Sequence, residues 1–248
     1  MSEIAVSFLP EMLYPADLHG RVCVVVDLLR ASTTIVRALE SGATCVVPCL
    51  TPQDAMQLRD SRTHEPALLG GERGGLLIPG FDLANSPSHY TPDRLLGKTL
   101  IFTTTNGTKA IHAGAGAAKL LIGCFANVSA LESAVARTQL PVHVLCAGTG
   151  GRITLEDCVF AGRLVSDFQF MGYLPRNDES HMARELYDNA SRTPDGVLRL
   201  MRQSVGGMNL DALGLGDDVE DCRREDCAEA VPMFDAASAV LTRFTINR

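Results

Sequence analysis

The sequence lacks three features that mark familiar classes of protein. No apolar run approaches the roughly 18 residues of a membrane span, and the start, Met-Ser-Glu-Ile-Ala-Val, has no basic segment ahead of an apolar one. There is no long run of Lys and Arg, and the net charge is −7. Binding to a nucleic-acid backbone needs clustered basic side chains. We therefore expect a cytoplasmic protein that has neither a membrane nor a nucleic acid as partner.

The third missing feature is a Cys-x-x-Cys pair, although the chain has eight cysteines. A structural zinc site or a redox dithiol is therefore not expected. Cys23, Cys45, Cys124 and Cys146 lie in or beside apolar runs, where a free thiol behaves as a small hydrophobic group. Cys146 ends a predicted strand, but no His is adjacent in sequence, so we expect it to pack in the core rather than act as a nucleophile.

Strand-like apolar runs alternate with helical patterns over the first two thirds of the chain. With 248 residues, 46% of them hydrophobic, the chain can bury a sizeable core. The alternation predicts an α/β protein, with helices layered on both sides of a mixed or mostly parallel sheet. We expect residues 1–248 to form one unit. The rhythm breaks after about residue 170, so a division into two subdomains there stays open. We expect residues 206–226 to form a loop and an acidic helical stretch, and residues 231–232 and 239–246 to return to the sheet.

The most informative stretch is Asp27-Leu-Leu-Arg-Ala-Ser-Thr-Thr34, which follows the apolar residues 22–26 and precedes a helical pattern over residues 31–41. This order predicts a buried strand, a turn and a helix start. Backbone N–H groups at a helix start favour an anion, and Arg30 adds a planar fork that suits phosphate or sulfonate. A carboxylate beside an anion site points to a bridging metal. A plainer interpretation stays open, in which Asp27 and the three hydroxyls only cap the helix.

Three further glycine- and threonine-rich turns follow predicted strands. They are Gly71-Glu-Arg-Gly-Gly75, Thr103-Thr-Thr-Asn-Gly-Thr108 and Ala147-Gly-Thr-Gly-Gly-Arg152. Glycine-rich backbone can wrap an anion, and hydroxyl groups can donate to it. Each turn by itself has an ordinary explanation as a loop, but the recurrence favours one shared site. We expect the strands that end near Asp27, Gly70, Thr103 and Cys146 to meet at one cleft.

Taken together, four segments resemble the 2-phosphosulfolactate phosphatase family, the ComB family of coenzyme M biosynthesis. The segments are residues 27–34, residues 71–75 with 79–87, residues 103–108, and residues 146–151 with Glu156-Asp157. The resemblance spans most of residues 20–165, and it continues more loosely in the acidic residues 217–227 and in Val231-Pro232. It implies a magnesium-dependent phosphoric monoester hydrolase that converts (2R)-phospho-3-sulfolactate into 3-sulfolactate and phosphate. A related phosphorylated hydroxy acid stays open as the substrate.

The resemblance and the residue types together indicate which side chains form the site. Catalytic roles are expected for Asp27, Arg30, Glu72 and Arg73. Binding of a small anionic phosphorylated substrate is expected for Ser32, Thr33, Thr34, Asn85, Ser86, Thr104, Thr105, Asn106, Gly107 and Gly148. Mg²⁺ ligands are expected among Asp27, Glu72, Glu156 and Asp157, because hard oxygen donors without a cluster of His or Cys favour Mg²⁺ over Zn²⁺.

Several alternatives stay open at this stage. Glu156 and Asp157 stand in the first turn of a predicted helix and can complement its dipole without binding a metal. Asp27 can attack phosphorus directly or only bind the metal, and a homodimer is neither predicted nor excluded. The competing functions are a non-catalytic anion-binding regulator and an isomerase or lyase of a phosphorylated acid. A pure binder of anions gains little from added negative charge, so the carboxylates favour an enzyme.

Overall fold

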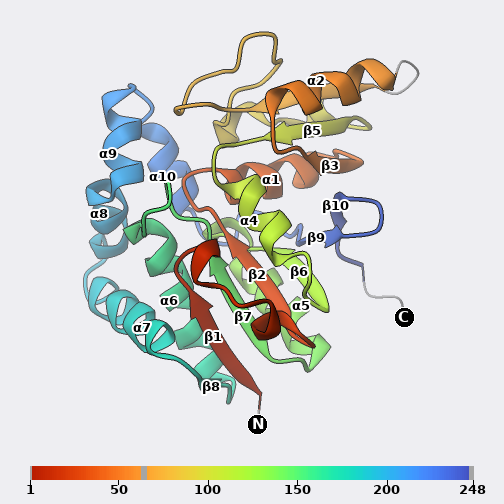
Figure 1. Cartoon of the computed structure of the whole chain (residues 1–248). Helices are drawn as coiled ribbons and strands as arrows, with labels where there is room; N and C mark the ends of the chain where they lie inside the picture. The colour runs from red at the N-terminus through yellow and green to blue at the C-terminus, as the bar shows by residue number, and fades with distance from the viewer. Residues whose placement is uncertain (1, 63–65, 246–248) are drawn as a thin grey trace.

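The computed structural model describes residues 2–62 and 66–245 and shows an α/β protein built on one mixed sheet of ten strands (Figure 1). The strand order is β4-β5-β3-β10-β9-β6-β2-β7-β1-β8. The strands are β1 (Glu3–Ser7), β2 (Val22–Val26), β3 (Cys45–Pro48), β4 (Ala67–Gly71), β5 (Thr99–Thr103), β6 (Lys119–Ile122), β7 (Val142–Cys146), β8 (Leu174–Pro175), β9 (Pro232–Asp235) and β10 (Val240–Arg243). The predicted fold class is thus confirmed.

Helices cover both faces of this sheet. The α-helices are α1 (Ala31–Glu40), α2 (Pro52–Ser61), α3 (Pro92–Leu95), α4 (Gly107–Gly114), α5 (Val128–Thr138), α6 (Leu155–Phe170), α7 (Asp178–Ala190), α8 (Gly196–Gln203), α9 (Val205–Ala212) and α10 (Asp217–Arg223). Short 3₁₀ turns are η1 (Pro10–Met12), η2 (Pro15–Leu18), η3 (Pro87–His89) and η4 (Phe125–Asn127). Among the described residues, no helix is both long and apolar enough to cross a membrane.

Strand β2 lies inside the sheet and is buried on both faces. Val22, Val24 and Val26 pack into the core that contains α5 and α6, whereas Cys23 and Val25 pack into the core that contains α1 and α4. Successive strand side chains point to opposite faces, so a strand covered on both sides has to be apolar at every position. This explains the unbroken run Val-Cys-Val-Val-Val.

The direction of the strands changes within the sheet. Strands β4, β5 and β3 are parallel to one another, as are β6, β2, β7, β1 and β8, but three successive antiparallel pairings through β10 and β9 separate the two groups. The two groups therefore run in formally opposite directions. Sheets twist by roughly 20° per pair of strands, and five pairs separate β5 from β2, which turns one against the other by roughly 100°.

The twist brings the carboxyl ends of both groups toward the same region. Figure 1 shows β5 lying across the upper part of the molecule while β2 and β1 run steeply below it. Strand ends that an untwisted sheet would place on opposite edges can consequently face one pocket. The strands need not all be parallel for this to happen.

The chain after residue 170 differs from the expectation in one respect and confirms it in another. Residues 205–212 form helix α9, where the sequence predicted a loop. The return to the sheet near residues 231–246 is confirmed, but β9 and β10 insert between β6 and β3 in the middle of the sheet. The end of that prediction, Ile246, lies outside the described residues.

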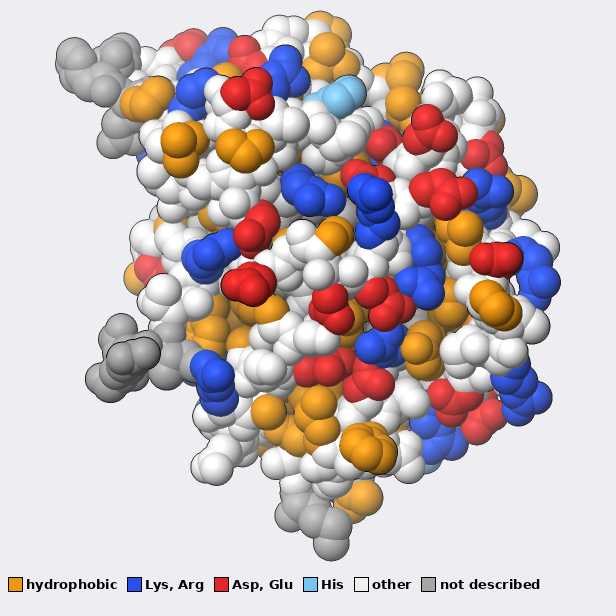
Figure 2. Space-filling view, turned by 180° about the vertical axis from the view of Figure 1, so that it is seen from behind, with side chains coloured by type: hydrophobic (Ala, Val, Ile, Leu, Met, Phe, Trp, Pro, Cys, Tyr) orange, Lys and Arg blue, Asp and Glu red, His pale blue; other side chains and the backbone are white. Residues whose placement is uncertain are grey.

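Charged side chains of both signs are interspersed over the face seen in Figure 2. Charged side chains at the surface form ion pairs, such as Arg163 with Glu225 at 3.0 Å and Arg223 with Glu225 at 2.8 Å. Exposed pairs of this kind contribute little to stability, typically below about 1 kcal/mol. The fold is therefore held mainly by its apolar cores.

Helix α7 crosses α6 at a glycine, which generates a stability prediction. A Cβ added at Gly162 would lie 1.9 Å from the carbonyl oxygen of Ala183, so α7 has to move to admit it. We expect Gly162→Ala to destabilise the fold by about 2 kcal/mol and to lower Tm by about 5 °C or more, measured by thermal unfolding. Gly116→Ala is the control, because an added Cβ there meets no atom within 4 Å. Equal Tm values for the two variants would contradict the close packing.

Candidate active site

One pocket of about 460 Å³ opens where the predicted strand ends meet. It is lined by Asp27, Leu29, Arg30, Glu72, Gly74, Gly75, Asn85, Thr105, Asn106, Thr149, Gly206, Asn209, Leu210, Ala212 and Leu213. These residues follow β2, β4, β5 and β7, and the remaining wall comes from α9. The expectation that four strand ends share one cleft is confirmed.

Asp27 stands at the end of β2 and is 9% exposed. Its Oδ1 accepts a hydrogen bond from Ala31 N–H at 3.3 Å, and its own N–H donates to Ser32 Oγ at 2.9 Å. A Cβ added at Gly107, the first residue of α4, would lie 2.7 Å from Asp27 Oδ2. Gly107 therefore allows the helix start to approach the carboxylate closely.

The environment of Asp27 disfavours its charged form. Burial raises the pKa of Asp27 to about 7, and the negative charges of Glu72 and Glu156 act in the same direction against the Ala31 hydrogen bond and the Arg30 charge. A carboxyl group with a pKa near neutrality can exchange a proton at physiological pH. Asp27 therefore accepts the capping hydrogen bond at the start of α1 and also has a pKa at which its carboxyl group can exchange a proton.

Glu72 joins two of the turns that line the pocket. Its Oε1 accepts from Thr105 N–H at 2.8 Å, and its Oε2 accepts from Gly75 N–H at 2.8 Å. The side chain is 8% exposed. We expected the backbone amides of these turns to bind a substrate anion. In the structure, the amides of Thr105 and Gly75 donate to a carboxylate of the protein instead.

Arg30 is almost completely buried and is paired. Its Nη1 donates to Asp218 and, at 3.1 Å, to Ser86 Oγ, while Nη2 donates to the carbonyl oxygen of Gly75 at 2.8 Å. The Arg30 and Asp218 side chains are 2% and 7% exposed. Arg30 lies at the pocket as expected, but both terminal nitrogens of its fork already have protein partners, as does Ser86.

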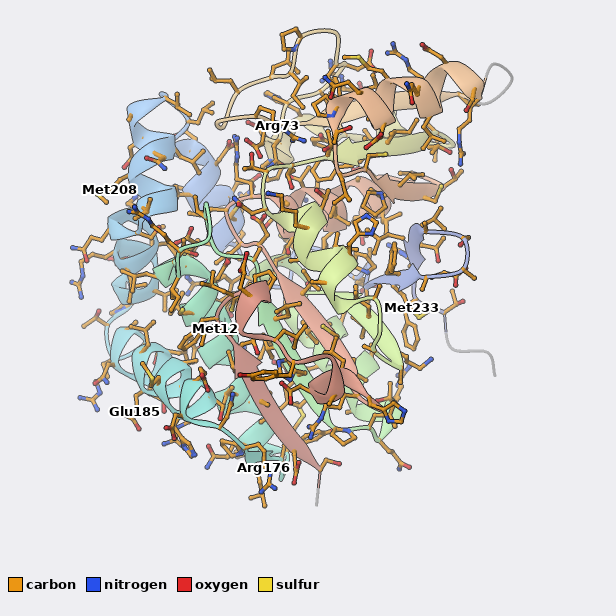
Figure 3. All side chains as sticks on the ribbon, in the orientation of Figure 1. Met12, Arg73, Arg176, Glu185, Met208 and Met233 are labelled. Atoms are coloured by element: carbon orange, nitrogen blue, oxygen red, sulfur yellow. The ribbon has the colours of Figure 1, made fainter. Side chains whose placement is uncertain are left out.

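Arg73 does not line the pocket. Its Nη1 donates to the carbonyl oxygen of Glu72 at 2.7 Å, and its Nη2 donates to Leu50 O and to Thr103 Oγ1. Figure 3 labels Arg73 on the loop after β4 and Met208 on α9. These two elements meet where Leu213 lies against Gly75, whose added Cβ would be 2.6 Å from Leu213 Cδ1. Arg73, for which we expected a catalytic role, therefore stabilises the loop through these hydrogen bonds and does not line the pocket.

The hydroxyls of α1 are buried and point into the protein. Ser32 Oγ accepts from Asp27 N–H, Thr33 Oγ1 donates to Leu28 O at 3.3 Å, and Thr34 Oγ1 donates to Asn85 O at 3.1 Å. None of the three lines the pocket. They shape the turn that carries Asp27, and a direct contact with substrate stays a prediction that this geometry does not favour.

Polar groups without protein partners gather at the pocket instead. Asn85 is 3% exposed and its Oδ1 has no hydrogen-bond partner, and the buried Thr105 Oγ1 also has none. Asn106 Oδ1 accepts from Gly150 N–H at 3.1 Å, which connects the turns after β5 and β7. Thr104 is different, because its hydroxyl accepts weakly from Thr108 N–H within the start of α4. Unsatisfied buried groups in a pocket mark places where a ligand can bind.

Asp157 and Gly148 belong to the support of the site. Asp157 Oδ1 accepts from Leu28 N–H at 2.8 Å and Oδ2 accepts from Gly148 N–H at 2.9 Å, so both oxygens hold strand ends together. Burial raises the pKa of Asp157 well above its usual range, and the nearby Glu156 and Asp27 add to this. Neither Asp157 nor Gly148 lines the pocket.

Glu156 lies beside the wall made by α9. It is 2% exposed, its Oε2 has no hydrogen-bond partner, and burial raises its pKa. A Cβ at Gly206, which lines the pocket, would lie 2.2 Å from Glu156 Oε1. Glu156 is thus close to the pocket without being part of its lining.

The oxygen donors at the pocket suit a magnesium ion. Within the described chain, no group of three or more His, Cys, Asp or Glu side chains is arranged as a metal site. Mg²⁺ needs fewer protein ligands than that, since it keeps several waters and commonly binds one or two carboxylates together with substrate phosphate. Asp27 and Glu72 supply two carboxylates, and the unpartnered Asn85 Oδ1 is a third hard oxygen donor. The residues present therefore fit Mg²⁺.

Sequence reasoning missed one wall of the pocket and one ion-pair partner. Gly206, Asn209 and Leu213 come from α9 or its end, where only the pair Gly206-Gly207 hinted at a close approach. Asp218 lies in an acidic stretch that resembled the family only loosely. No local pattern indicates that its carboxylate would pair with an arginine far away in sequence.

The fold and the pocket define a class: an α/β enzyme that acts on a small molecule held at the ends of its strands. Residues 8–237 match the family model described as 2-phosphosulpholactate phosphatase. The chain belongs to this family, and with it to the phosphoric monoester hydrolases.

Relatives of the chain are similar over nearly their whole length. A probable 2-phosphosulfolactate phosphatase of Symbiobacterium thermophilum is 42% identical over 230 residues, which cover 91% of this chain and 96% of the relative. Probable 2-phosphosulfolactate phosphatases of Carboxydothermus hydrogenoformans and Thermotoga maritima are 36% and 34% identical, over 93% and 92% of this chain and 92% and 96% of the relatives.

The raised pKa of Asp27 predicts a pH-dependent stability. The folded protein binds this proton more tightly than the unfolded chain, so the contribution of Asp27 to stability falls as pH rises from about 4 to about 7. In EDTA, wild type should lose more unfolding free energy between about pH 5 and pH 8 than Asp27→Asn does, by more than about 1 kcal/mol. Chemical unfolding at each pH measures this difference.

The control for this experiment is Asp60→Asn, which removes a carboxylate whose side chain is 76% exposed. Its pH profile should follow that of wild type. A profile of Asp27→Asn that runs parallel to wild type would show that Asp27 titrates normally in the folded protein.

Proposed function

We propose that this chain is a Mg²⁺-dependent phosphatase that hydrolyses 2-phosphosulfolactate, or a closely related phosphorylated hydroxy acid, to the hydroxy acid and phosphate. The observation that carries the proposal is the meeting of Asp27 and Glu72, from loops far apart in sequence, in one pocket at the strand ends. The family and the names of the relatives support the same reaction type.

The charge of the pocket supports a cation as part of the site. Asp27 and Glu72 are acidic, and the charge of Arg30 is balanced by Asp218. A substrate with phosphate, carboxylate and sulfonate groups is strongly anionic, and like charges in a partly buried site repel strongly. Asp27 and Glu72 would hold Mg²⁺, which would supply positive charge for the phosphoryl oxygens of the substrate and for the transition state.

The chain's own groups account for the remaining steps. Hydrolysis forms a bond between a water oxygen and phosphorus and breaks the bond between phosphorus and the 2-oxygen of the acid, which takes up a proton as it leaves. Asp27 Oδ1 is engaged with Ala31 N–H, so Oδ2 is the oxygen left to hold the cation and to orient the attacking water. The proton that this water loses and the proton that the 2-oxygen gains are exchanged with solvent. The unpartnered Thr105 hydroxyl can donate a hydrogen bond to the anionic substrate, whereas the unpartnered Asn85 Oδ1 is an acceptor and suits the cation.

Enclosure by α9 completes the arrangement. Leu210 and Leu213 give the pocket an apolar wall opposite the strand-end turns. Such a wall excludes bulk water and strengthens the electrostatic interactions inside the pocket.

Release of inorganic phosphate tests the proposal directly. Across a panel of phosphorylated hydroxy acids that includes 2-phosphosulfolactate, we expect phosphate release that EDTA abolishes and added Mg²⁺ restores. Glu72→Gln keeps the shape of the side chain but removes its charge and one of its two acceptors, so kcat/KM should fall by about 100-fold or more. A phosphate-release assay with purified protein measures both effects.

The matched control is Glu185→Gln on α7, an exposed glutamate that Figure 3 places at the outer edge of the molecule. It should retain wild-type kinetics. Tight binding of the phosphorylated acids without any phosphate release would favour an anion-binding regulator, and chemical conversion without phosphate release would favour an isomerase or lyase. Full activity in EDTA would remove Asp27 and Glu72 from the metal role.

A further inference from the structure

Asp218 is a buried carboxylate that no part of the proposed chemistry uses. It stands in the first turn of α10 and is 5% exposed. Its Oδ2 accepts hydrogen bonds from Arg30 Nη1 and from Ser86 Oγ, the latter at 2.8 Å. Ser86 Oγ also lies 3.1 Å from Arg30 Nη1, so the three polar groups form a closed triangle. Three segments distant in sequence are joined at this point.

The hydrogen bonds continue from this triangle to the pocket carboxylate Glu72. Arg30 Nη2 donates to Gly75 O at 2.8 Å, and Gly75 N–H donates to Glu72 Oε2 at 2.8 Å. The order is therefore Asp218, Arg30, Gly75, Glu72. In this series of hydrogen bonds, Asp218 is the end that lies outside the pocket, whereas Arg30, Gly75 and Glu72 all line it.

The burial of Arg30 explains why a partner is necessary. An unpaired charge in a buried position costs several kcal/mol, and removing one member of a buried pair leaves that cost on the other. An arginine that is 2% exposed at the edge of a pocket for anions would otherwise turn toward solvent or bind the anion tightly. Asp218 prevents both, because it fixes the guanidinium and balances its charge.

We propose that Asp218 is a positioning residue, which holds Arg30 against Gly75, and through it the Glu72 loop, and which limits the attraction of Arg30 for the phosphate product. Its effect on turnover rests on the proposed function, whereas its effect on anion binding does not. The two effects have opposite signs. Without the carboxylate, inorganic phosphate binds more tightly because the Arg30 charge is no longer balanced, but turnover falls because Arg30 and the Glu72 loop lose their support.

The binding experiment titrates inorganic phosphate in the presence of MgCl₂ into wild type, Asp218→Asn and Asp217→Asn by calorimetry. Asp217 is the matched control, since it is the exposed neighbour in the same turn of α10. We expect Asp218→Asn to lower Kd for phosphate by about threefold or more and Asp217→Asn to leave it within about twofold, because exposed charges are screened by solvent and salt. Unchanged or weaker binding by a folded Asp218→Asn protein overturns the proposal.

The kinetic experiment asks whether Asp218 acts through Arg30. Asp218→Asn should lower kcat by about tenfold or more while inhibition by phosphate becomes stronger, a combination that general loss of structure does not produce. In the Arg30→Met background, Asp218→Asn should change neither kcat nor phosphate binding, since the group it positions is absent. An equal effect of Asp218→Asn in both backgrounds would mean that it acts independently of Arg30 and would overturn the proposal.

The double variant Arg30→Met/Asp218→Leu keeps the test decisive if the single variant does not fold. Replacing both members of a buried ion pair by apolar residues of similar size is often neutral for stability. This variant should unfold within about 5 °C of wild type and have a kcat about tenfold lower or more. A kcat within about threefold of wild type would show that the positioned Arg30 is not needed. If wild type releases no phosphate from any substrate while the binding results hold, the proposed function fails and the role of Asp218 remains.

Discussion

The structure depends on holding several carboxylates close together at the ends of β2, β4 and β7. Asp27, Glu72 and Asp157 are each 9% exposed or less, and each accepts hydrogen bonds from backbone N–H groups, Asp27 within its own turn and the other two also from neighbouring turns. These bonds lower the energy of the charged forms, while burial and mutual repulsion raise it, as the raised pKa values of Asp27 and Asp157 show. The balance leaves an acidic site, which suits the cation that we propose.

This constraint gives the glycine- and threonine-rich turns a different role from the one that the sequence suggested. Their backbone amides are not free to wrap a substrate anion, since Gly75 and Thr105 donate to Glu72 and Gly148 donates to Asp157. The turns hold the carboxylates, and the carboxylates in turn suit the cation proposed to hold the substrate. Under the proposed function, an anion would be recognised indirectly, through the cation, together with unpartnered side-chain groups such as the buried Thr105 Oγ1.

The last third of the chain completes the pocket from outside the strand-turn-helix pattern. Helix α9 supplies a wall, and α10 supplies Asp218, whose carboxylate balances Arg30 on the opposite side of the site. Strands β9 and β10 meanwhile separate the two groups of parallel strands and contribute to the twist between them. A segment that shows no catalytic pattern thus determines the enclosure and the charge of the site.

Local patterns in the sequence were enough to predict the α/β class, the strand and the helix on either side of Asp27 and the convergence of four strand ends. The apolar run ending at Asp27, Thr51 as the cap of α2 and Gly42 with φ of 87° at the end of α1 all behave as their local chemistry dictates. Such features depend on neighbouring residues, which the sequence displays directly. The central positions of Asp27 and Glu72 in the pocket could be predicted for the same reason.

Tertiary structure alone decided how each polar group is used. Whether Arg30 is free for a ligand depends on Asp218, which is 188 residues away in sequence, and whether the hydroxyls of Ser32 and Thr34 face a pocket depends on the packing of α1. A side chain has the same hydrogen-bonding capacity in any fold, but its partners are those that folding brings within about 3 Å. The sequence therefore determines which polar groups are available to the site. Only folding determines which of them have partners within the protein and which of them are left to bind a ligand.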